Sequence, residues 1–441
     1  MLSFAKRERA QRARAVVGID AGKSAHALVV RPRDEADSRP LTFKTTHEGF
    51  ANAVAFIARI TNGAPPAEVL VGIEFAGSYG FTFAHYLAAL GFQIVSVLPS
   101  DTKRWKEVMH HQALKTDAKD ALGITDLVAT GHFVSFPFLK PEYATLRYLV
   151  SGRERVSLLR RAALTRLKMV LELVFPEYEQ VFRTFTGRTS LALLKAYPGP
   201  DALRSASKRA VLALLKKESL NHLKLDHYER LMDAAGHSLA LPGAQGVLKD
   251  EIPLLIELIE VYQHQLGQFE ERMRVALDAV PEGKYVLTVP NVAPVTAAVF
   301  LGSIGDPRAY ESVKQVLKLA GLSLVEKSSG TSKGKEHISK RGRPVLRRYA
   351  YILAVRNVTK GGMYRAQYEA LLARNGGKKM PALTAIGRRA LSLLYCIARE
   401  RRPFEMVKPH GAAGAPCETA EDILEMPSEM PSDQQTAEDL A

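Results

Sequence analysis

Two short apolar runs in the first part of the chain each end in a carboxylate. Residues 16–19 (Val-Val-Gly-Ile) lead into Asp20, and residues 69–73 (Val-Leu-Val-Gly-Ile) lead into Glu74. Apolar runs of this length, rich in β-branched residues, are typical of strands buried inside a sheet. Parallel strands present their carboxyl ends at one edge of a sheet, where functional groups gather. We therefore expect an α/β domain in which Asp20 and Glu74 lie close together.

The patterns around these two runs predict the order of the elements. Residues 15–30 are predicted to form two strands around a glycine turn. Strand and helix patterns then alternate, with Gly and Pro breakers between them. The later elements are predicted as a strand at 41–44, a helix at 48–60, a strand ending at 74, a helix at 79–90, a strand at 93–98 and further helix to 129. This order is that of a ribonuclease H-like (RuvC-like) fold, which we predict for residues 15–135.

Asp117 and Asp120 form a second acidic pair, on a segment predicted to be helical. Residues three apart lie on the same face of a helix, so both carboxylates can join Asp20 and Glu74 at one site. Hard divalent cations prefer oxygen ligands. Two such ions about 3.5–4 Å apart stabilise the attacking and the leaving oxygen of a phosphodiester. We predict that all four acids are catalytic metal ligands, for Mg²⁺ or Mn²⁺.

A single acid at the end of a strand or helix has a simpler explanation as a helix cap, a turn former or a solvated surface group. We assign Asp101 and Asp126 to that class. Four acids in consistent places favour a site. Trp105, beside Lys103, Arg104 and Lys106, is either a core residue or a group that stacks on nucleic acid.

The charge distribution indicates a polyanionic partner. The chain carries a formal charge of +15. From residue 411 onward it has eight acids and no Lys or Arg, so residues 1–410 alone carry +23. Such a surplus favours nucleic acid through the release of counterions. A merely soluble basic protein is the alternative.

The number of cysteines and the lengths of the apolar segments limit the classes of protein to which the chain can belong. Cys396 and Cys417 are the only cysteines, too few for a disulfide framework or a zinc cluster. The N-terminus is charged and lacks an apolar signal segment. No stretch approaches the roughly 20 apolar residues of a membrane span. We expect an intracellular protein that does not interact with membranes.

The remainder of the chain is predicted to be mainly helical. Long helical patterns at 141–175 and 248–280 flank short helices at 190–241, and we assign residues 140–282 to a linker domain. The long helices are predicted to pair as an antiparallel coiled coil, with an ordinary bundle as the alternative. Residues 284–405 form a third, mostly helical domain. The acidic tail at 406–441 has few large apolar groups, so we predict disorder.

A serine-rich loop in the third domain is a second candidate site. Ser328, Ser329 and Ser332 are surrounded by Lys327, Lys333 and Lys335. A serine hydroxyl becomes a nucleophile only when its proton is taken and its target is polarised. The alternative is a flexible loop that contacts phosphates. A basic segment follows at 339–348, and we predict that it binds the nucleic-acid backbone through Lys340, Arg341, Arg343 and Arg347.

Taken together, these residues resemble the insertion-sequence family 110 transposases, the DEDD-type recombinases guided by a bridge RNA. The resemblance covers nearly all of residues 15–405. The family pattern D…E…D-x-x-D is matched by Asp20, Glu74, Asp117 and Asp120. The C-terminal landmarks are Tyr310, Ala320-Gly321-Leu322, Ser329-Gly330, Ser339-Lys340-Arg341-Gly342 and Leu346-Arg347.

The resemblance implies a transposase that cuts and rejoins DNA without a hydrolytic intermediate. Ser329 would attack a phosphodiester and form a phosphoserine link, while the acidic tetrad holds Mg²⁺. The active site would combine domains of different protomers in a homodimer or homotetramer. A structured non-coding guide RNA would select donor and target DNA by base pairing. The location implied is the bacterial cytoplasm, at the nucleoid.

Two departures from the family pattern matter. Family members usually carry Pro-Gly-x-Gly before the C-terminal domain, and this chain has Pro290-Asn291-Val292-Ala293. The loss of both glycines argues against a turn that cradles phosphate with its amides. Ser328 directly precedes Ser329, so the choice of nucleophile depends on the neighbouring Gly330.

Three other functions compete with transposition. A RuvC-like endonuclease would resolve branched DNA with metal-activated water and would not need Ser329. The turn at 20–24 (Asp-Ala-Gly-Lys-Ser) also resembles the phosphate loop of actin-like sugar kinases, although no second such domain follows residue 150. A non-catalytic RNA-binding protein remains if the tetrad does not assemble.

Overall fold

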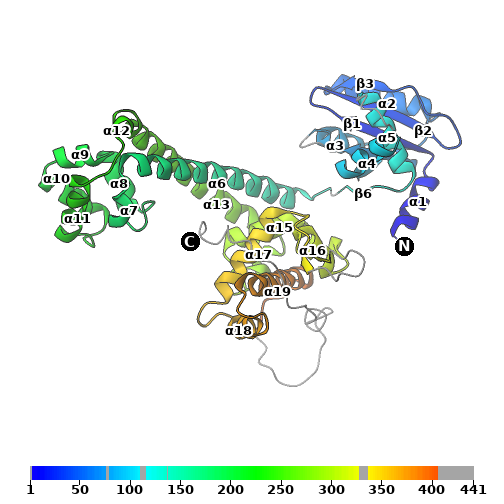
Figure 1. Ribbon diagram of the computed structural model, residues 1–441. Helices are drawn as coiled ribbons and strands as arrows, with labels where there is room; N and C mark the ends of the chain where they lie inside the picture. Colours follow the sequence, from blue (N-terminus) through cyan, green and yellow to red (C-terminus); the bar gives the residue numbers. More distant parts are fainter. Residues whose placement is uncertain (1, 76–78, 110–115, 137, 327–335, 406–441) are drawn as a thin grey trace, which may run out of the picture. The chain divides into compact units, whose positions relative to one another are not determined.

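The computed structural model describes residues 2–75, 79–109, 116–136, 138–326 and 336–405 (Figure 1). The chain divides into two compact units, residues 1–138 and 139–441. The first is a mixed α/β unit and the second is mostly helical, as predicted. The predicted disordered tail at 406–441 lies outside the described residues. No helix in the described ranges is long and apolar enough to cross a membrane.

One mixed sheet organises the N-terminal unit, with the strand order β3-β2-β1-β4-β5-β6. β1, β4 and β5 pair in parallel, whereas the pairs β1–β2, β2–β3 and β5–β6 are antiparallel. The strands are β1 (Ala15–Ala21), β2 (Ala25–Pro32), β3 (Leu41–Lys44), β4 (Val69–Glu74), β5 (Gln93–Val97) and β6 (Val134–Ser135).

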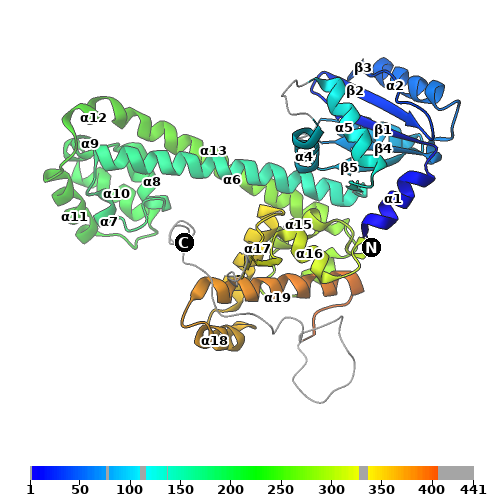
Figure 2. The same ribbon diagram turned by 45° about the vertical axis from the view of Figure 1, so that its right-hand side comes forward.

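Helices cover both faces of this sheet. α2 (His47–Ile60) and α3 (Phe81–Ala89) pack on the face that carries Val17 and Ile19. The opposite face, which carries Val16 and Leu70, packs against α5 (Asp117–Ala129), with α1 (Leu2–Arg12) and α4 (Pro99–Met109) beside it. Figure 2 shows α5 lying across this face of the sheet. Both faces are covered, which is why the central strands are apolar without alternation.

The predicted order of strands and helices over residues 15–129 is confirmed, with ends shifted by a few residues. Two elements were not predicted. α1 is polar almost all round and buries little besides Ala10, so it has no apolar stripe that marks a helix. β6 has two residues, too few for a strand pattern.

Two long helices form the axis of the C-terminal unit. α6 (Pro141–Val174) and α13 (Glu251–Asp278) lie side by side (Figure 1). Arg153 Nη2 lies 2.6 Å from Glu270 Oε1, and Arg166 Nη2 lies 2.7 Å from Glu251 Oε2. Positions later in α6 therefore pair with positions earlier in α13, so the helices are antiparallel. The two predicted long helices are confirmed; their coiled-coil character stays a prediction.

Each end of the long pair carries its own core. The C-terminal half of α6 and the start of α13 pack with short helices, among them the predicted set at 190–241. These helices are α7 (Tyr178–Val181), α8 (Arg188–Ala196), α9 (Pro200–Ser205), α10 (Lys208–Glu218), α11 (Leu225–Gly236) and α12 (Pro242–Val247).

The other end of the pair packs against the C-terminal part of the chain. Its core joins Tyr143 and Leu146 of α6 and Leu277 of α13 with the apolar faces of five later helices. The elements are α14 (Gly283–Val286), α15 (Pro294–Ile304), α16 (Val313–Ala320), β7 (Leu324–Glu326), β8 (Glu336–Ile338), α17 (Pro344–Asn357), α18 (Arg365–Arg374) and α19 (Lys379–Glu400).

Candidate functional site

Asp20 and Glu74 end neighbouring parallel strands and lie opposite each other in the pairing of β1 with β4. Gly18 and Gly72, two residues earlier, are also opposite each other. Successive side chains of a strand point to opposite faces, so residues two apart share a face. Asp20 and Glu74 therefore project to the same face as the two glycine positions. The predicted meeting of these carboxylates at one sheet edge is supported by this register.

The two glycines let α5 lie against the backbone of the sheet. A Cβ on Gly18 would lie 2.3 Å from Thr125 Oγ1, and a Cβ on Gly72 would lie 2.1 Å from Val128 Cγ2. Such distances are overlaps, so any larger side chain would push the helix away. The face that the glycines present is thus the face that α5 covers, and the strand-end carboxylates point toward the same helix.

The first turn of α5 presents the other two acids. Thr116 caps the helix, with its Oγ1 accepting from the Lys119 amide at 3.4 Å. Asp117 and Asp120 occupy the first turn, where the helix dipole favours negative charge. Asp117 is exposed, whereas Asp120 is only 8% exposed and faces the sheet.

Three carboxylates are close enough to Asp20 to affect it electrostatically. The pKa of Asp20 is raised from 3.8 to about 6, first by burial and then by the charges of Asp120, Glu74 and Asp117. Lys106 opposes this rise. Burial and neighbouring negative charge therefore both disfavour the charged form of Asp20. A bound cation would favour that charged form.

Lys106, on α4, places one positive charge beside the acidic tetrad of Asp20, Glu74, Asp117 and Asp120. Its Nζ lies 2.8 Å from Asp120 Oδ1, and its side chain is 38% exposed. Trp105, the neighbouring residue, is half-buried and packs against Gly123 of α5, where a Cβ would lie 2.6 Å from the indole ring. The core alternative for Trp105 is therefore supported, and its packing holds α4 beside α5.

The donor set suits a hard divalent cation, because all four groups are carboxylates. In the described ranges, however, no three Asp, Glu, His or Cys side chains converge as ligands of a single metal ion. The four carboxylates therefore lie near one another without forming a common ligand set, and one of them, Asp120, pairs with Lys106. Asp126 is used elsewhere, since Arg31 Nη2 donates to its Oδ1 at 2.7 Å.

The predicted serine site lies where the structure is not described. β7 and β8 form an antiparallel hairpin, and the residues between them are 327–335. Ser329 and the three lysines Lys327, Lys333 and Lys335 lie in this gap. Their roles stay predictions.

The basic segment after β8 packs against the end of α16. The Lys340 amide donates to Gly321 O at 3.0 Å, and the Arg343 amide donates to Leu319 O at 2.7 Å. Lys340 and Arg341 are exposed. The segment is therefore fixed by its backbone, and these two side chains are available to a ligand.

Arg347 has a different environment from the one predicted. Its Nη1 donates to Ala320 O at 3.0 Å and to Lys340 O at 3.2 Å. The guanidinium thus ties the start of the basic segment to the end of α16. This contact supports a positioning role, with binding of nucleic acid by Arg347 left as a prediction.

The turn before α15 keeps the backbone that a glycine would adopt. Asn291 has φ 64°, in the left-handed region that Asn tolerates better than other non-glycine residues. Its Nδ2 donates to Oδ1 of the buried Asn357 at 3.0 Å. The substitution of Asn for glycine therefore preserves the turn, and the absence of glycine is a weaker objection than the sequence suggests.

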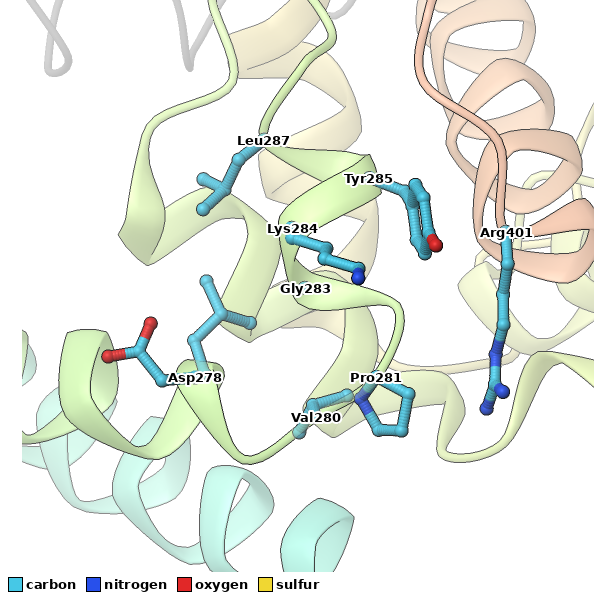
Figure 3. A pocket seen from close by; sticks show the side chains of 9 residues that line it. Asp278, Val280, Pro281, Gly283, Lys284, Tyr285, Leu287 and Arg401 are labelled. Atoms are coloured by element: carbon cyan, nitrogen blue, oxygen red, sulfur yellow. The ribbon is translucent and has the colours of Figure 1, made fainter.

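A separate hollow in the C-terminal unit contains none of the predicted site residues. It has a volume of about 350 Å³, and Figure 3 shows its lining from the α13–α14 corner and from Arg401. Arg401 Nη2 lies 2.8 Å from Oε1 of Glu282, which is fully buried and accepts from Tyr143 Oη at 2.6 Å. These contacts indicate a structural ion pair beside the hollow.

In comparisons with known proteins, family models match two separate segments of the chain. A DEDD transposase model of IS110, described as Transposase, matches residues 17–176, and a model of the Transposase IS116/IS110/IS902 family matches residues 283–369. Together they match more than half of the chain.

The chain belongs to the IS110 family of transposases. The first match contains Asp20, Glu74, Asp117 and Asp120, and the second contains the serine loop and the basic segment. Membership implies an enzyme that processes DNA. The family resemblance read from the sequence is thus confirmed.

Two relatives span most of this IS110-family chain, and a third matches about a third of it. The 43.6 kDa protein of insertion element IS110 from Streptomyces coelicolor is 27% identical over 320 residues, covering 72% of this chain and 78% of that protein. The 42 kDa protein of IS900 from Mycobacterium paratuberculosis is 26% identical over 400 residues, covering 90% and 98%. A pilin gene-inverting protein of Moraxella lacunata is 27% identical over 154 residues, covering 33% and 47%.

The sequence predictions missed three residues that shape the acidic group of this transposase. Gly18 and Gly72 had a signal, because both strands read Val-Gly-Ile followed by an acid. The shared glycine two residues before each carboxylate indicates that one helix crosses both strands closely. Lys106 had no such signal, since its contact with Asp120 depends on how α4 packs on α5.

Proposed function

We propose that this IS110-family transposase cuts and rejoins DNA with the acidic tetrad of the N-terminal unit and a serine of the C-terminal unit. The observation that carries the proposal is the position of Asp20, Glu74, Asp117 and Asp120 around the start of α5. The strand order β3-β2-β1-β4-β5-β6 supports a ribonuclease H-like fold for residues 15–135. In this sheet β2 is antiparallel to β1, whereas β1, β4 and β5 are parallel. Residues 140–282 serve as a coiled-coil linker and 284–405 as the transposase domain.

The four carboxylates hold Mg²⁺ or Mn²⁺, the ions that suit oxygen ligands. A bound ion supplies charge stabilisation to the scissile phosphate. The raised pKa of Asp20 supports this role, because it reflects burial and then the charges of three neighbouring carboxylates, which Lys106 offsets only in part. A bound ion would compete with Lys106 for Asp120, whose Oδ1 the ammonium engages.

Ser329 is the nucleophile of the proposed reaction. Its Oγ forms a bond to phosphorus while the bond from phosphorus to one deoxyribose oxygen breaks. The serine proton is transferred overall to the released sugar hydroxyl, so the number of phosphate esters is unchanged. Attack of a sugar hydroxyl on the phosphoserine then restores DNA and the serine. Lys327, Lys333 and Lys335 neutralise the phosphate during both steps.

The proposal includes the partners that the family implies. Donor and target DNA bind the basic segment through Lys340, Arg341 and Arg343, and a structured non-coding RNA selects the sequences by base pairing. Two or four copies assemble so that the acidic group of one protomer acts with the serine of another. The working location is bacterial cytoplasm, on nucleoid DNA. The pilin gene-inverting relatives support recombination as the outcome.

A RuvC-like endonuclease that resolves branched DNA is the alternative, because the acidic group alone would serve it. The two functions differ in their dependence on Ser329. Strand exchange between labelled donor and target duplexes, with the element's RNA and Mg²⁺, should be abolished by Ser329→Ala and by Asp120→Asn. Cleavage of branched DNA by Ser329→Ala at the wild-type rate would instead support the endonuclease. Ser332→Ala is the matched control and should keep strand exchange.

A further inference from the structure

Arg147 of α6 is held against the last turn of α15. Its Nε donates to Gly302 O at 2.9 Å, and its Nη2 donates to Ser303 O at 3.0 Å. Gly302 permits this contact, because a Cβ there would lie 3.0 Å from the Leu146 carbonyl carbon. The guanidinium has five N–H donors. Both hydrogens of Nη1 therefore remain for another partner.

Arg343 and Tyr310 complete a cluster around Arg147. Tyr310 Oη donates to Ile304 O at 2.6 Å, the carbonyl next to those that Arg147 uses. Arg343 precedes α17 and is half-buried, like Arg147. Burial and then the charge of Arg343 lower the pKa of Arg147 to about 10, so the two cations lie near each other. Burial likewise lowers the pKa of Arg343.

The two guanidinium groups have no carboxylate to neutralise them. Across the described ranges neither Arg147 nor Arg343 takes part in an ion pair, whereas Arg153 and Arg348 nearby pair with Glu270 and Glu154. Burial of like charges without a counter-ion is unfavourable. Planar guanidinium groups bind phosphate oxygens with two parallel hydrogen bonds. A phosphodiester has the charge and the oxygens that this cluster lacks.

We propose that Arg147 and Arg343 together bind one phosphate of a DNA strand, with Tyr310 beside them. The assignment of DNA as the ligand rests on the proposed function. DNA is favoured over RNA because Arg343 ends the basic segment that follows the serine loop, where the strand to be cut must pass. Arg147 thereby becomes a binding residue that lies outside both the basic segment and the acidic tetrad.

Salt-dependent binding of the full-length protein tests the proposal. The probe is a fluorescein-labelled 30-base-pair duplex without a cleavage site, measured by anisotropy in EDTA from 50 to 300 mM NaCl. Arg147→Gln and Arg343→Gln should each weaken binding by about tenfold and lower the salt slope by about one. Because both act on one phosphate, the double variant should lose clearly less than the product of the two single losses. Arg308→Gln is the control, since Arg308 is exposed in the same region.

Several outcomes would overturn the proposal: wild-type affinity of Arg147→Gln, fully additive losses in the double variant, or losses confined to an RNA probe of the same length. Arg343→Gln removes no hydrogen bond and should fold normally. Should Arg147→Gln not fold, Arg147→Lys replaces it and should weaken binding several-fold, because an ammonium lacks the planar donor geometry with which a guanidinium binds a phosphate through two parallel hydrogen bonds. If Arg147→Lys and Arg343→Gln each bind DNA with wild-type affinity, the proposed phosphate site is overturned. Cleavage is absent from this assay, so its failure leaves the proposed reaction standing.

Discussion

Gly18 of β1 lies opposite Gly72 of β4, and a Cβ on either residue would overlap α5. This pair sets how closely the helix approaches the sheet. The same approach brings the first turn of α5, with Asp117 and Asp120, to the carboxyl ends of the two strands. A candidate metal site thus depends on two residues that carry no functional group.

Replacement of either glycine should destabilise the N-terminal unit. Gly18→Ala and Gly72→Ala are expected to cost about 1–3 kcal/mol, because overpacking forces the helix or the strand to shift. Trp105 is the only tryptophan of the chain and packs on α5, so its fluorescence during urea unfolding reports this unit. Gly267→Ala in α13 is the control, followed by circular dichroism at 222 nm, and it should not lower stability, since nothing lies within 4 Å of its Cβ position. Unchanged unfolding of both sheet variants would show that α5 does not need the glycines.

Removal of the Lys106 charge should destabilise the metal-free protein and favour Mg²⁺. Lys106→Met leaves Asp120 nearly buried without its partner, at a cost of about 1–2 kcal/mol once solvent screening is allowed for. Added Mg²⁺ should restore more stability to this variant than to the wild type, because the ion no longer competes with the ammonium. Lys103→Met is the control, since Lys103 is 80% exposed and 3.9 Å from Glu107. Equal Mg²⁺ responses in all three proteins would contradict the competition.

The pKa of Asp20 predicts a pH dependence of stability. The folded-state pKa of about 6 lies above the ordinary 3.8, so between these values the folded protein holds a proton that the unfolded chain has released. The contribution is fully present below pH 3.8 and is lost as the pH rises through 6. In EDTA at pH 7.5, Asp20→Asn should therefore be more stable than the wild type by about 1–2 kcal/mol after screening.

The advantage of Asp20→Asn should shrink toward pH 4.5, as measured by Trp105 fluorescence in urea. A constant difference between wild type and Asp20→Asn across this range would mean that Asp20 does not titrate there.

The buried ion pair of the C-terminal unit predicts an asymmetry between two variants. Arg401→Met leaves the fully buried Glu282 charge without its ion-pair partner and should lower the melting temperature. Glu282→Gln should cost less, because Arg401 is 36% exposed and can be solvated. Thermal unfolding followed by circular dichroism at 222 nm compares them. Arg402→Met, whose partner Glu400 lies on the surface side of the same helix end, should change stability by less than about 0.5 kcal/mol.

The strands and the two strand-end acids were predictable because burial on both faces leaves an uninterrupted apolar run with a clear end. The register of Asp20 with Glu74 followed from the parallel arrangement. The contact of Lys106 with Asp120 was not predictable, because it depends on the packing of α4 against α5. The environment of Arg347 was also hidden: sequence shows a cation, but only the fold shows the backbone carbonyls that it binds.

Trapping of the covalent intermediate tests whether Ser329 and the acidic tetrad act on the same phosphate. The purified protein, the RNA of its flanking element and suicide DNA substrates are incubated with Mg²⁺, and the DNA-linked peptide is identified by mass spectrometry. We expect a DNA adduct on Ser329 that disappears in EDTA, in Ser329→Ala and in Asp120→Asn, and that persists in Ser328→Ala. An adduct on another residue, or cleavage to free ends that Ser329→Ala performs as fast as the wild type, would contradict the joint action of serine and tetrad.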